Sequence, residues 1–151
     1  MASSKKGAMG VGISLNAPAD CVDYFRDIFP YAGLVKDEKY NLPLIKALKS
    51  ALSGRQYIDE LPLDMDVTPF QELVLRETAK IPFGQTRTYG DIAWSVNRPK
   101  GARAIGQVMN RNPLPLIFPC HRVVAAKGVG GFGGGIELKK YLLEREGISY
   151  A

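Results

Sequence analysis

Residues 88–110 read TYGDIAWSVNRPKGARAIGQVMN, a pattern typical of two short helices joined by a tight turn. Thr88 is suited to begin the first helix, over Tyr89–Val96, because its hydroxyl can accept a hydrogen bond from a backbone amide. Asn97-Arg98-Pro99 supplies the turn, and the second helix is expected over Gly101–Asn110. The segment therefore predicts a helix-turn-helix, although a helical hairpin inside a core would have a similar sequence.

The second helix carries a face of unusually small side chains. Gly101, Ala102 and Ala104 are too short to reach base edges in a wide major groove. A slim helix of this kind suits the narrow minor groove, from which Arg103 is long enough to reach between bases. We therefore expect the chain to bind double-stranded DNA through the minor groove, with little sequence preference.

Basic residues gather around the same segment. The chain has a net charge of +5, and one short window holds many of its basic residues beside a single acid, Asp91. These basic residues are Arg87, Arg98, Lys100, Arg103 and Arg111. Such a stripe is the charge pattern of a phosphate-binding face, and from charge alone a solvated helix surface explains it equally well.

A second informative stretch, Pro119-Cys120-His121-Arg122, places the only histidine of the chain beside one of its two cysteines. The thiolate is the reactive form of cysteine, and an adjacent imidazole can activate it by taking the thiol proton. The proline-braced run 112–119 is expected to be non-helical and to deliver Cys120 on rigid, extended backbone. A glycine-rich loop follows at 128–135, where the chain can approach a ligand closely. A buried cysteine next to a surface histidine would have the same sequence, so the dipeptide alone leaves the site open.

Composition limits the other function classes. The chain has 151 residues with 46% hydrophobic content, and it contains no run of transmembrane length and no recognisable signal peptide. We therefore expect a cytoplasmic protein without a membrane partner. With one histidine and two distant cysteines, no zinc site of the usual spacing can be written, so no metal and no cofactor are expected. Cys21 and Cys120 are both expected to be free thiols.

The chain divides near residue 64. In the first part, residues 1–64, a strand is expected at Gly10–Leu15 and a helix from Pro18-Ala19-Asp20 through Phe29. A further helix is expected over Leu42–Leu52, ended by Gly54. This part reads as a small N-terminal α/β domain.

The second part, residues 65–151, begins with a clear helix signal. Thr68 is the expected N-cap, Pro69 the first helical residue, and Pro82-Phe83-Gly84 the stop. The helix-turn-helix follows. We therefore predict an α+β fold, in which the N-terminal domain precedes a mainly helical C-terminal domain with a winged-helix-like DNA-binding motif.

Several short motifs, taken in order, resemble those of the O6-alkylguanine-DNA alkyltransferases. They span about residues 67–147, and their combination is highly specific. The motifs are Ile81-Pro82-Phe83-Gly84-Gln85, Thr88-Tyr89, Ala102-Arg103-Ala104-Ile105-Gly106, Asn112-Pro113, Pro119-Cys120-His121-Arg122-Val123-Val124 and Leu142-Leu143-Glu144-Arg145-Glu146-Gly147. Residues 1–64 carry no such motif, so only their position assigns them to the small N-terminal domain of that family.

The resemblance implies direct reversal of DNA damage. Members of this family flip an alkylated guanine out of the duplex through the minor groove and move the alkyl group irreversibly to a cysteine. Each molecule therefore acts once, in the manner of a suicide methyltransferase. O6-alkylguanine, and with it O4-alkylthymine, is the implied substrate, and a monomer is the implied state.

The matching motifs also imply a role for individual residues. Cys120 is the nucleophile, His121 takes its proton through a bound water, and Glu146 orients the imidazole. Tyr89 donates a proton to the departing base, and Asn112 fixes the turn before the active-site strand. The implied base pocket is lined by Tyr89, Met109, the Val123 carbonyl, Phe132 and the Gly133 amide. The implied DNA contacts come from Thr88, Gly101, Ala102, Arg103 and Ala104, with Arg103 filling the gap that the flipped base leaves.

Two departures and two alternative functions accompany the resemblance. The glycine-rich loop at 128–135 is one residue shorter and richer in glycine than in some members. Many relatives have a tyrosine where this chain has Phe132, which keeps a stacking face and loses a hydroxyl. A non-catalytic protein that binds alkylguanine lesions is one alternative, but that branch lacks the cysteine, so Cys120 argues against it. A helix-turn-helix regulator with an inert thiol is the other, and it would need base-reading side chains where this chain has glycine and alanine.

Overall fold

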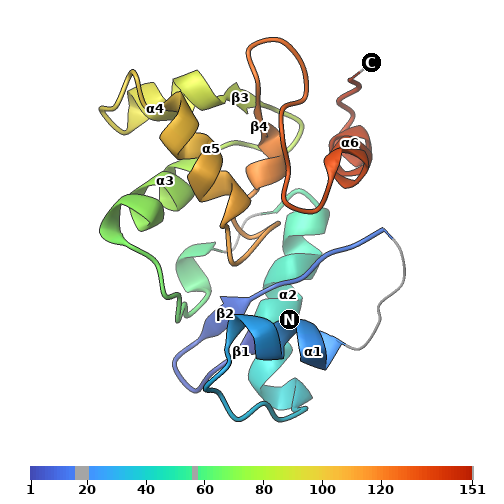
Figure 1. Cartoon of the computed structure of the whole chain (residues 1–151). Helices are drawn as coiled ribbons and strands as arrows, with labels where there is room; N and C mark the ends of the chain where they lie inside the picture. Colours follow the sequence, from blue (N-terminus) through green and yellow to red (C-terminus); the bar gives the residue numbers. More distant parts are fainter. Residues whose placement is uncertain (16–20, 56–57, 151) are drawn as a thin grey trace.

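Helices and two small sheets form two consecutive groups of elements in the computed structural model of this chain (Figure 1). The structure describes residues 1–15, 21–55 and 58–150, and the side chain of Cys21 lies outside the described part. None of the helices within these ranges is long and apolar enough to cross a membrane. The first group comprises β1 (Ala2–Ser3), β2 (Ala8–Gly10), α1 (Cys21–Ile28) and α2 (Glu38–Leu52). The second comprises α3 (Pro69–Ala79), β3 (Arg87–Thr88), α4 (Tyr89–Ser95), α5 (Ala102–Asn110), β4 (Val123–Val124) and α6 (Ile136–Arg145), and short 3-10 turns lie at Ile58–Glu60 and Cys120–Arg122.

The two sheets each have two strands, and the second sheet joins distant parts of the chain. β1 and β2 pair in antiparallel orientation. β3 and β4 pair in parallel, with Arg87 opposite Val123 and Thr88 opposite Val124. The start of α4 therefore lies beside the segment that follows the Cys-His dipeptide. Small sheets among helices confirm the predicted α+β class.

Capping side chains fix the starts of the helices in the second group. The Thr68 hydroxyl accepts a hydrogen bond from the Gln71 amide at 3.2 Å, and the Gln71 side chain accepts one from the Thr68 amide at 2.8 Å. Thr88 and Asp91 form the same reciprocal pair at the start of α4, at 3.1 and 2.8 Å. α4 and α5 pack against each other and against α3 (Figure 1). These contacts confirm the predicted caps and the helix-turn-helix, whose second helix begins at Ala102.

The first strand and helix differ from the expectations. The strand expected at Gly10–Leu15 is wrong, because β2 ends at Gly10 and the amide of Val11 donates instead to the carbonyl of Pro113 at 2.8 Å. A hydrogen bond to a distant loop therefore replaces the next hydrogen bond between β1 and β2. The helix start expected at Pro18-Ala19-Asp20 lies outside the described residues, and the helix ends at Ile28.

The helix α2 begins four residues before the expected Leu42. Pro43 would suit the first turn of a helix that begins at Leu42. The Asp37 side chain nevertheless accepts a hydrogen bond from the Lys39 amide at 2.8 Å and caps the helix at Glu38. A good cap therefore moves the boundary and leaves Pro43 inside the helix.

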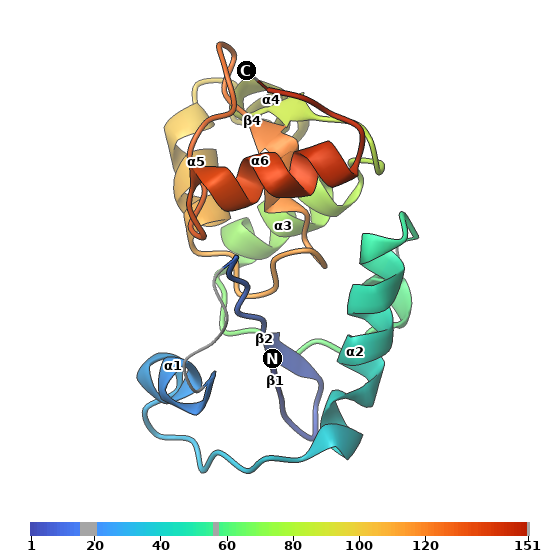
Figure 2. The same ribbon diagram turned by 90° about the vertical axis from the view of Figure 1, so that its right-hand side faces the viewer.

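Apolar side chains of both groups share one core. Leu44 of α2 and Ala8 of β2 are buried in the same cluster as Val74, Ile92 and Phe118. Figure 2 shows β1, β2, α1 and most of α2 lying below the helices of the C-terminal group. The domain boundary near residue 64 stays a prediction, since side chains from both sides of it pack together.

Replacing Leu44 by alanine should destabilise the whole chain, because this fully buried side chain belongs to the shared core. A buried leucine-to-alanine change costs about 2–5 kcal/mol of unfolding free energy. We expect a single cooperative denaturant transition with a lower midpoint, followed both by circular dichroism and by the fluorescence of Trp94. The exposed Leu52→Ala variant is the control and should move the midpoint little. Two separate transitions, with the fluorescence transition unmoved, would contradict a shared core.

Candidate active site

Cys120 lies at the end of a tightly turned run. Its side chain is 4% exposed. The expectation that residues 112–119 deliver it on extended backbone is wrong, because Cys120–Arg122 form a 3-10 turn and the Cys120 amide donates to the Phe118 carbonyl at 2.7 Å. Leu116 adopts a left-handed conformation with φ +75°, which turns the chain before the cysteine. Prolines exclude an α-helix from this run, but they leave tight turns available.

The Asn112 side chain holds this turn together. Its oxygen accepts a hydrogen bond from the Leu114 amide at 3.0 Å, and its Nδ2 donates to the Phe118 carbonyl at 2.8 Å. The same Nδ2 lies 3.1 Å from the sulfur of Cys120 and donates to it. Asn112 therefore fixes the loop after α5 and the position of the sulfur at once. The predicted turn-forming contact is present, and it includes the thiol itself.

The thiol of Cys120 is protonated in this environment. Burial raises its pKa to about 11, against the opposing effects of the Asn112 hydrogen bond and the Lys139 ammonium. At neutral pH very little thiolate is present. The sulfur can therefore act as a nucleophile only if a neighbouring group removes its proton.

His121 has the properties of that base. The ring is 2% exposed, its Nε2 lies 2.7 Å from a Glu146 oxygen, and its buried Nδ1 has no hydrogen-bond partner among the described residues. Burial lowers the pKa of His121, although the Glu146 contact opposes this shift, so the ring is neutral near pH 7. Because an ionised carboxylate can only accept, the single ring proton lies on Nε2. The lone pair of Nδ1 remains available to accept a proton.

Glu146 is ionised because three groups donate to it. Arg122 Nε lies 2.9 Å from one carboxylate oxygen and Arg122 Nη2 lies 3.0 Å from the other, while the Gly84 amide donates at 3.0 Å. Burial opposes ionisation, and the hydrogen bonds from His121, Arg122 and Gly84 outweigh it, so the pKa of Glu146 is lowered to about 2. The predicted contact between Glu146 and His121 is therefore present in a charge-assisted cluster.

Arg122 completes this cluster, and the sequence analysis gave it no role. The guanidinium is buried and also donates to the Ile81 carbonyl at 2.8 Å. It thereby joins the end of α3 to the turn that carries Cys120. A signal was present, because an arginine inside an apolar run such as 114–124 requires a buried acidic partner.

Tyr89, the first residue of α4, faces the glycine-rich loop. Its hydroxyl donates to the Gly131 carbonyl at 3.1 Å, and burial raises its pKa, so it keeps its proton at neutral pH. Gly130 makes this approach possible, because a Cβ there would lie 3.0 Å from both the Tyr89 ring and the Ala125 amide, at φ +73°. A proton donor therefore lies between the helix-turn-helix and the loop.

Lys139 is a second buried cation at this site, and the sequence analysis did not single it out. Its ammonium is buried, donates to the Val123 carbonyl at 2.6 Å and the Gly131 carbonyl at 3.0 Å, and lies 5.7 Å from the centre of the Tyr89 ring. Burial lowers its pKa to about 8, and the neighbouring Cys120 opposes that shift. The signal was its spacing, because Lys139 shares one helix face with Leu142 and Leu143.

The residues predicted to line a base pocket lie at different depths. Val123 is fully buried, whereas Phe132 is partly buried and packs against the core. Gly133 is exposed, and a Cβ there would lie 3.4 Å from the side-chain oxygen of Asn110. The loop thus contacts Lys139 at Gly131 and approaches the C-terminal end of α5 at Gly133.

Met109 is buried in the core beside α3. Its side chain is 6% exposed, and its sulfur accepts a hydrogen bond from the Thr78 hydroxyl at 3.8 Å. This contact joins α5 to α3 within the core. The role of Met109 in a base pocket stays a prediction.

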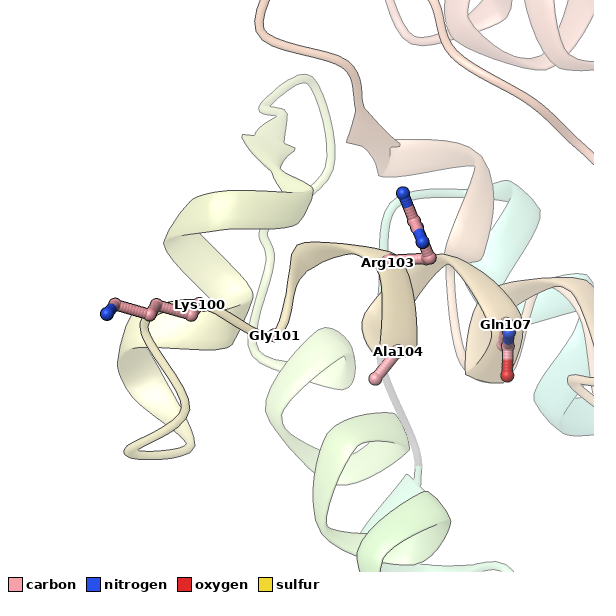
Figure 3. Close-up of a pocket in the computed structure, with 5 residues that line it drawn as sticks. All are labelled: Lys100, Gly101, Arg103, Ala104 and Gln107. Atoms are coloured by element: carbon pink, nitrogen blue, oxygen red, sulfur yellow. The ribbon is translucent and has the colours of Figure 1, made fainter.

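The residues predicted to contact DNA surround the start of α5. Ala102, Arg103 and Ala104 are exposed, and Gly101 is partly exposed. An open concavity of about 520 Å³ is lined here by Lys100, Gly101, Arg103, Ala104 and Gln107 (Figure 3). Thr88 differs, because its hydroxyl is occupied in the cap of α4. Gln107 is a further lining residue that the sequence analysis did not single out.

Known proteins share much of this chain. A family model described as 6-O-methylguanine DNA methyltransferase, DNA binding domain, matches residues 69–148. The inducible methylated-DNA–protein-cysteine methyltransferase of Bacillus subtilis is 34% identical over 147 residues, which cover 97% of this chain and 82% of that protein. The methylated-DNA–protein-cysteine methyltransferase of Methanosarcina acetivorans is 38% identical over 114 residues, which cover 75% of this chain and 73% of that protein. The crystal structure of Mycobacterium tuberculosis OGT in complex with DNA is similar with a TM-score of 0.61 and 39% identity, covering 69% of this chain and 65% of that chain.

Modification of Cys120 by iodoacetamide should require high pH, because burial holds the thiol pKa at about 11. In a Cys21→Ser variant, Cys120 is the only cysteine that iodoacetamide can modify. We expect its modification rate to rise throughout a series from about pH 6 to about pH 10, whereas a free cysteine peptide levels off near pH ~8.5. Mass spectrometry measures both rates, and a protein rate that levels off with the peptide would contradict the buried thiol.

The Glu146→Gln variant should lose about 3–5 kcal/mol of unfolding free energy, because Arg122 is left buried without its anionic partner. A carboxyl group whose pKa is lowered stabilises the fold fully above its ordinary value of 4.5, and this contribution fades as pH falls toward about 2. The difference between wild type and variant should therefore be constant at neutral pH and shrink below about pH 4.5. Denaturant titrations measure it, with the exposed Glu144→Gln as control. A difference that stays constant down to low pH would contradict the ionised cluster.

Proposed function

The chain belongs to the 6-O-methylguanine DNA methyltransferase family, and we propose that it repairs duplex DNA by transferring the alkyl group of O6-alkylguanine to its own Cys120. Family membership makes it a methylated-DNA–protein-cysteine methyltransferase. The observation that carries the choice of Cys120 is the geometry around its sulfur. Asn112 holds the sulfur at 3.1 Å, and the neighbouring His121 has an unpartnered Nδ1 and an ionised partner in Glu146.

The first half of the proposed reaction removes the thiol proton. His121 Nδ1 accepts it through a water molecule, and the imidazolium is stabilised by the ionised Glu146. The thiol pKa of about 11 means that proton removal and attack on the alkyl carbon proceed together, because free thiolate is scarce. The buried ammonium of Lys139 favours the negative charge that grows on the sulfur.

The second half moves the alkyl group. A bond forms between the Cys120 sulfur and the alkyl carbon, the bond from that carbon to guanine O6 breaks, and its electron pair goes to the purine. Tyr89 donates its proton to the departing guanine, which leaves neutral. The proton held by His121 then restores Tyr89 through solvent. The net change is a thiol and an alkylguanine converted to a thioether and guanine.

Single turnover follows from the product. A thioether has no acidic proton and is a poor leaving group, and none of the side chains described around the sulfur can regenerate the thiol. Each molecule would therefore repair one base.

Chemistry on guanine O6 also requires the base to leave the stack. Extrusion costs a few kcal/mol, and a side chain that fills the gap offsets part of this cost. Arg103 is exposed on α5 between the small residues Ala102 and Ala104, which supports an approach of this helix along the minor groove. The flipped guanine, or the less bulky O4-alkylthymine, would enter between Tyr89 and the glycine-rich loop.

A non-catalytic lesion-binding protein is the second candidate function. It would share the DNA-binding face and would need no activated thiol. The hydrogen bond from Asn112 to the Cys120 sulfur and the unpartnered Nδ1 of His121 favour alkyl transfer over binding alone.

Two variants test the proposal. Cys120→Ala should bind duplex DNA containing O6-methylguanine and transfer no methyl group, as measured by loss of the lesion from labelled duplex. Arg103→Ala should react with duplex DNA at least about tenfold more slowly and with free O6-benzylguanine almost normally, because only the duplex reaction requires a base stack to be refilled. Transfer by Cys120→Ala would refute the nucleophile. Equal losses of Arg103→Ala on both substrates would refute its role in base flipping.

A further inference from the structure

Polar side chains without protein partners surround the concavity at the start of α5. Lys100, Arg103 and Gln107 are exposed, and within the described part of the chain their side chains make no hydrogen bond, ion pair or ring contact (Figure 3). Some other basic side chains are engaged within the protein, as Arg76 is with Glu72 and Arg122 with Glu146. The side chains of Lys100, Arg103 and Gln107 therefore have hydrogen-bonding groups that no described residue of the chain occupies.

Gln107 differs chemically from its neighbours. Lys100 and Arg103 only donate hydrogen bonds, whereas a glutamine amide has two donor hydrogens and an acceptor oxygen. The other lining residues, Gly101 and Ala104, carry no polar side-chain atom. Gln107 is thus the one side chain lining this concavity that can distinguish a donor from an acceptor on its ligand.

Its position on the helix suits a base pair beside the lesion. Arg103 and Gln107 are four residues apart on α5, so they share a face and lie about 6 Å apart along the axis. Base pairs are stacked about 3.4 Å apart, so this offset is roughly two base steps for a helix that follows the groove. When Arg103 fills the gap of the flipped base, this offset brings Gln107 to a pair one or two steps from the lesion.

The minor-groove edges of A·T and G·C pairs differ in the hydrogen-bonding groups that they present to the Gln107 amide. An A·T pair presents only acceptors there, whereas a G·C pair adds the N2 amino donor of guanine. A glutamine amide can donate to guanine N3 and accept from guanine N2 at the same time. With A·T the second bond has no donor, so the amide oxygen stays unpaired.

We infer that Gln107 reads the minor-groove edge of a base pair flanking the lesion and favours guanine there. The inference rests on the proposed function, since it requires α5 to lie in the minor groove. It makes repair depend on sequence at one flanking position in a face that is otherwise blind to sequence. Gln107 is a specificity-determining residue in this role, and it takes no part in the transfer step.

The test uses the inosine·cytosine pair, which lacks only the N2 amino group of guanine·cytosine. Each duplex carries one O6-methylguanine. One base pair is varied at a time, at the first or the second position on the 5′ or the 3′ side of the lesion, and it is a G·C, an inosine·C or an A·T pair. Single-turnover transfer rates are measured for wild type, Gln107→Ala and the control Lys100→Ala. Inosine pairs are weaker and ease base extrusion in every variant, so the G·C to inosine·C rate ratio is compared between proteins.

At one flanking position we expect this ratio to be about fivefold higher, or more, for wild type than for Gln107→Ala. Lys100→Ala should slow all duplexes alike, lessen the salt dependence and keep the wild-type ratio. A ratio equal in wild type and Gln107→Ala at every position overturns the inference. Absence of transfer from every duplex, with Cys120 intact, overturns the proposed function instead, so the two failures are distinct.

Discussion

The buried carboxylate of Glu146 fixes the positions of His121 and Arg122 beside Cys120. It accepts hydrogen bonds from His121, Arg122 and the Gly84 amide, and these donors come from two chain segments that meet the end of α6. Its ionisation directs the imidazole proton of His121 to Nε2 and leaves Nδ1 as a base. Without this anion, Arg122 would be a buried unpaired charge and the tautomer of His121 would be undetermined.

Burial makes the thiol inert at rest and suits it to one reaction. A pKa of about 11 protects Cys120 from solvent electrophiles, which matters for a protein proposed to spend its cysteine once. The same low-dielectric surroundings strengthen the effect of the Lys139 ammonium on charge at the sulfur. Lys139 also binds the Gly131 carbonyl that the Tyr89 hydroxyl contacts, so the loop, α4 and α6 share one frame. The residues proposed as nucleophile, base and acid are therefore positioned by contacts within the protein.

Local sequence patterns predicted the helix starts and the Cys-His pair, but they did not predict the features that depend on tertiary contacts. The sequence was sufficient to identify the helix caps Thr68 and Thr88 and the Cys-His pair, because each depends only on residues close together in the chain. The end of β2 at Gly10 could not be predicted from nearby residues, because the Val11 amide donates its hydrogen bond to the carbonyl of Pro113, far along the chain. The turn at Cys120 and the burial of Lys139 likewise depend on tertiary contacts, although the apolar spacing around Lys139 was a usable clue.

The most direct measurement is the intact mass of the protein, with peptide mapping, after mixing with a duplex that contains one O6-methylguanine. The account predicts a gain equal to one methyl group in place of one hydrogen, located on Cys120, with no repair beyond one base per molecule. An unchanged mass with tight binding to the damaged duplex would contradict it and would favour a protein that recognises the lesion without removing it.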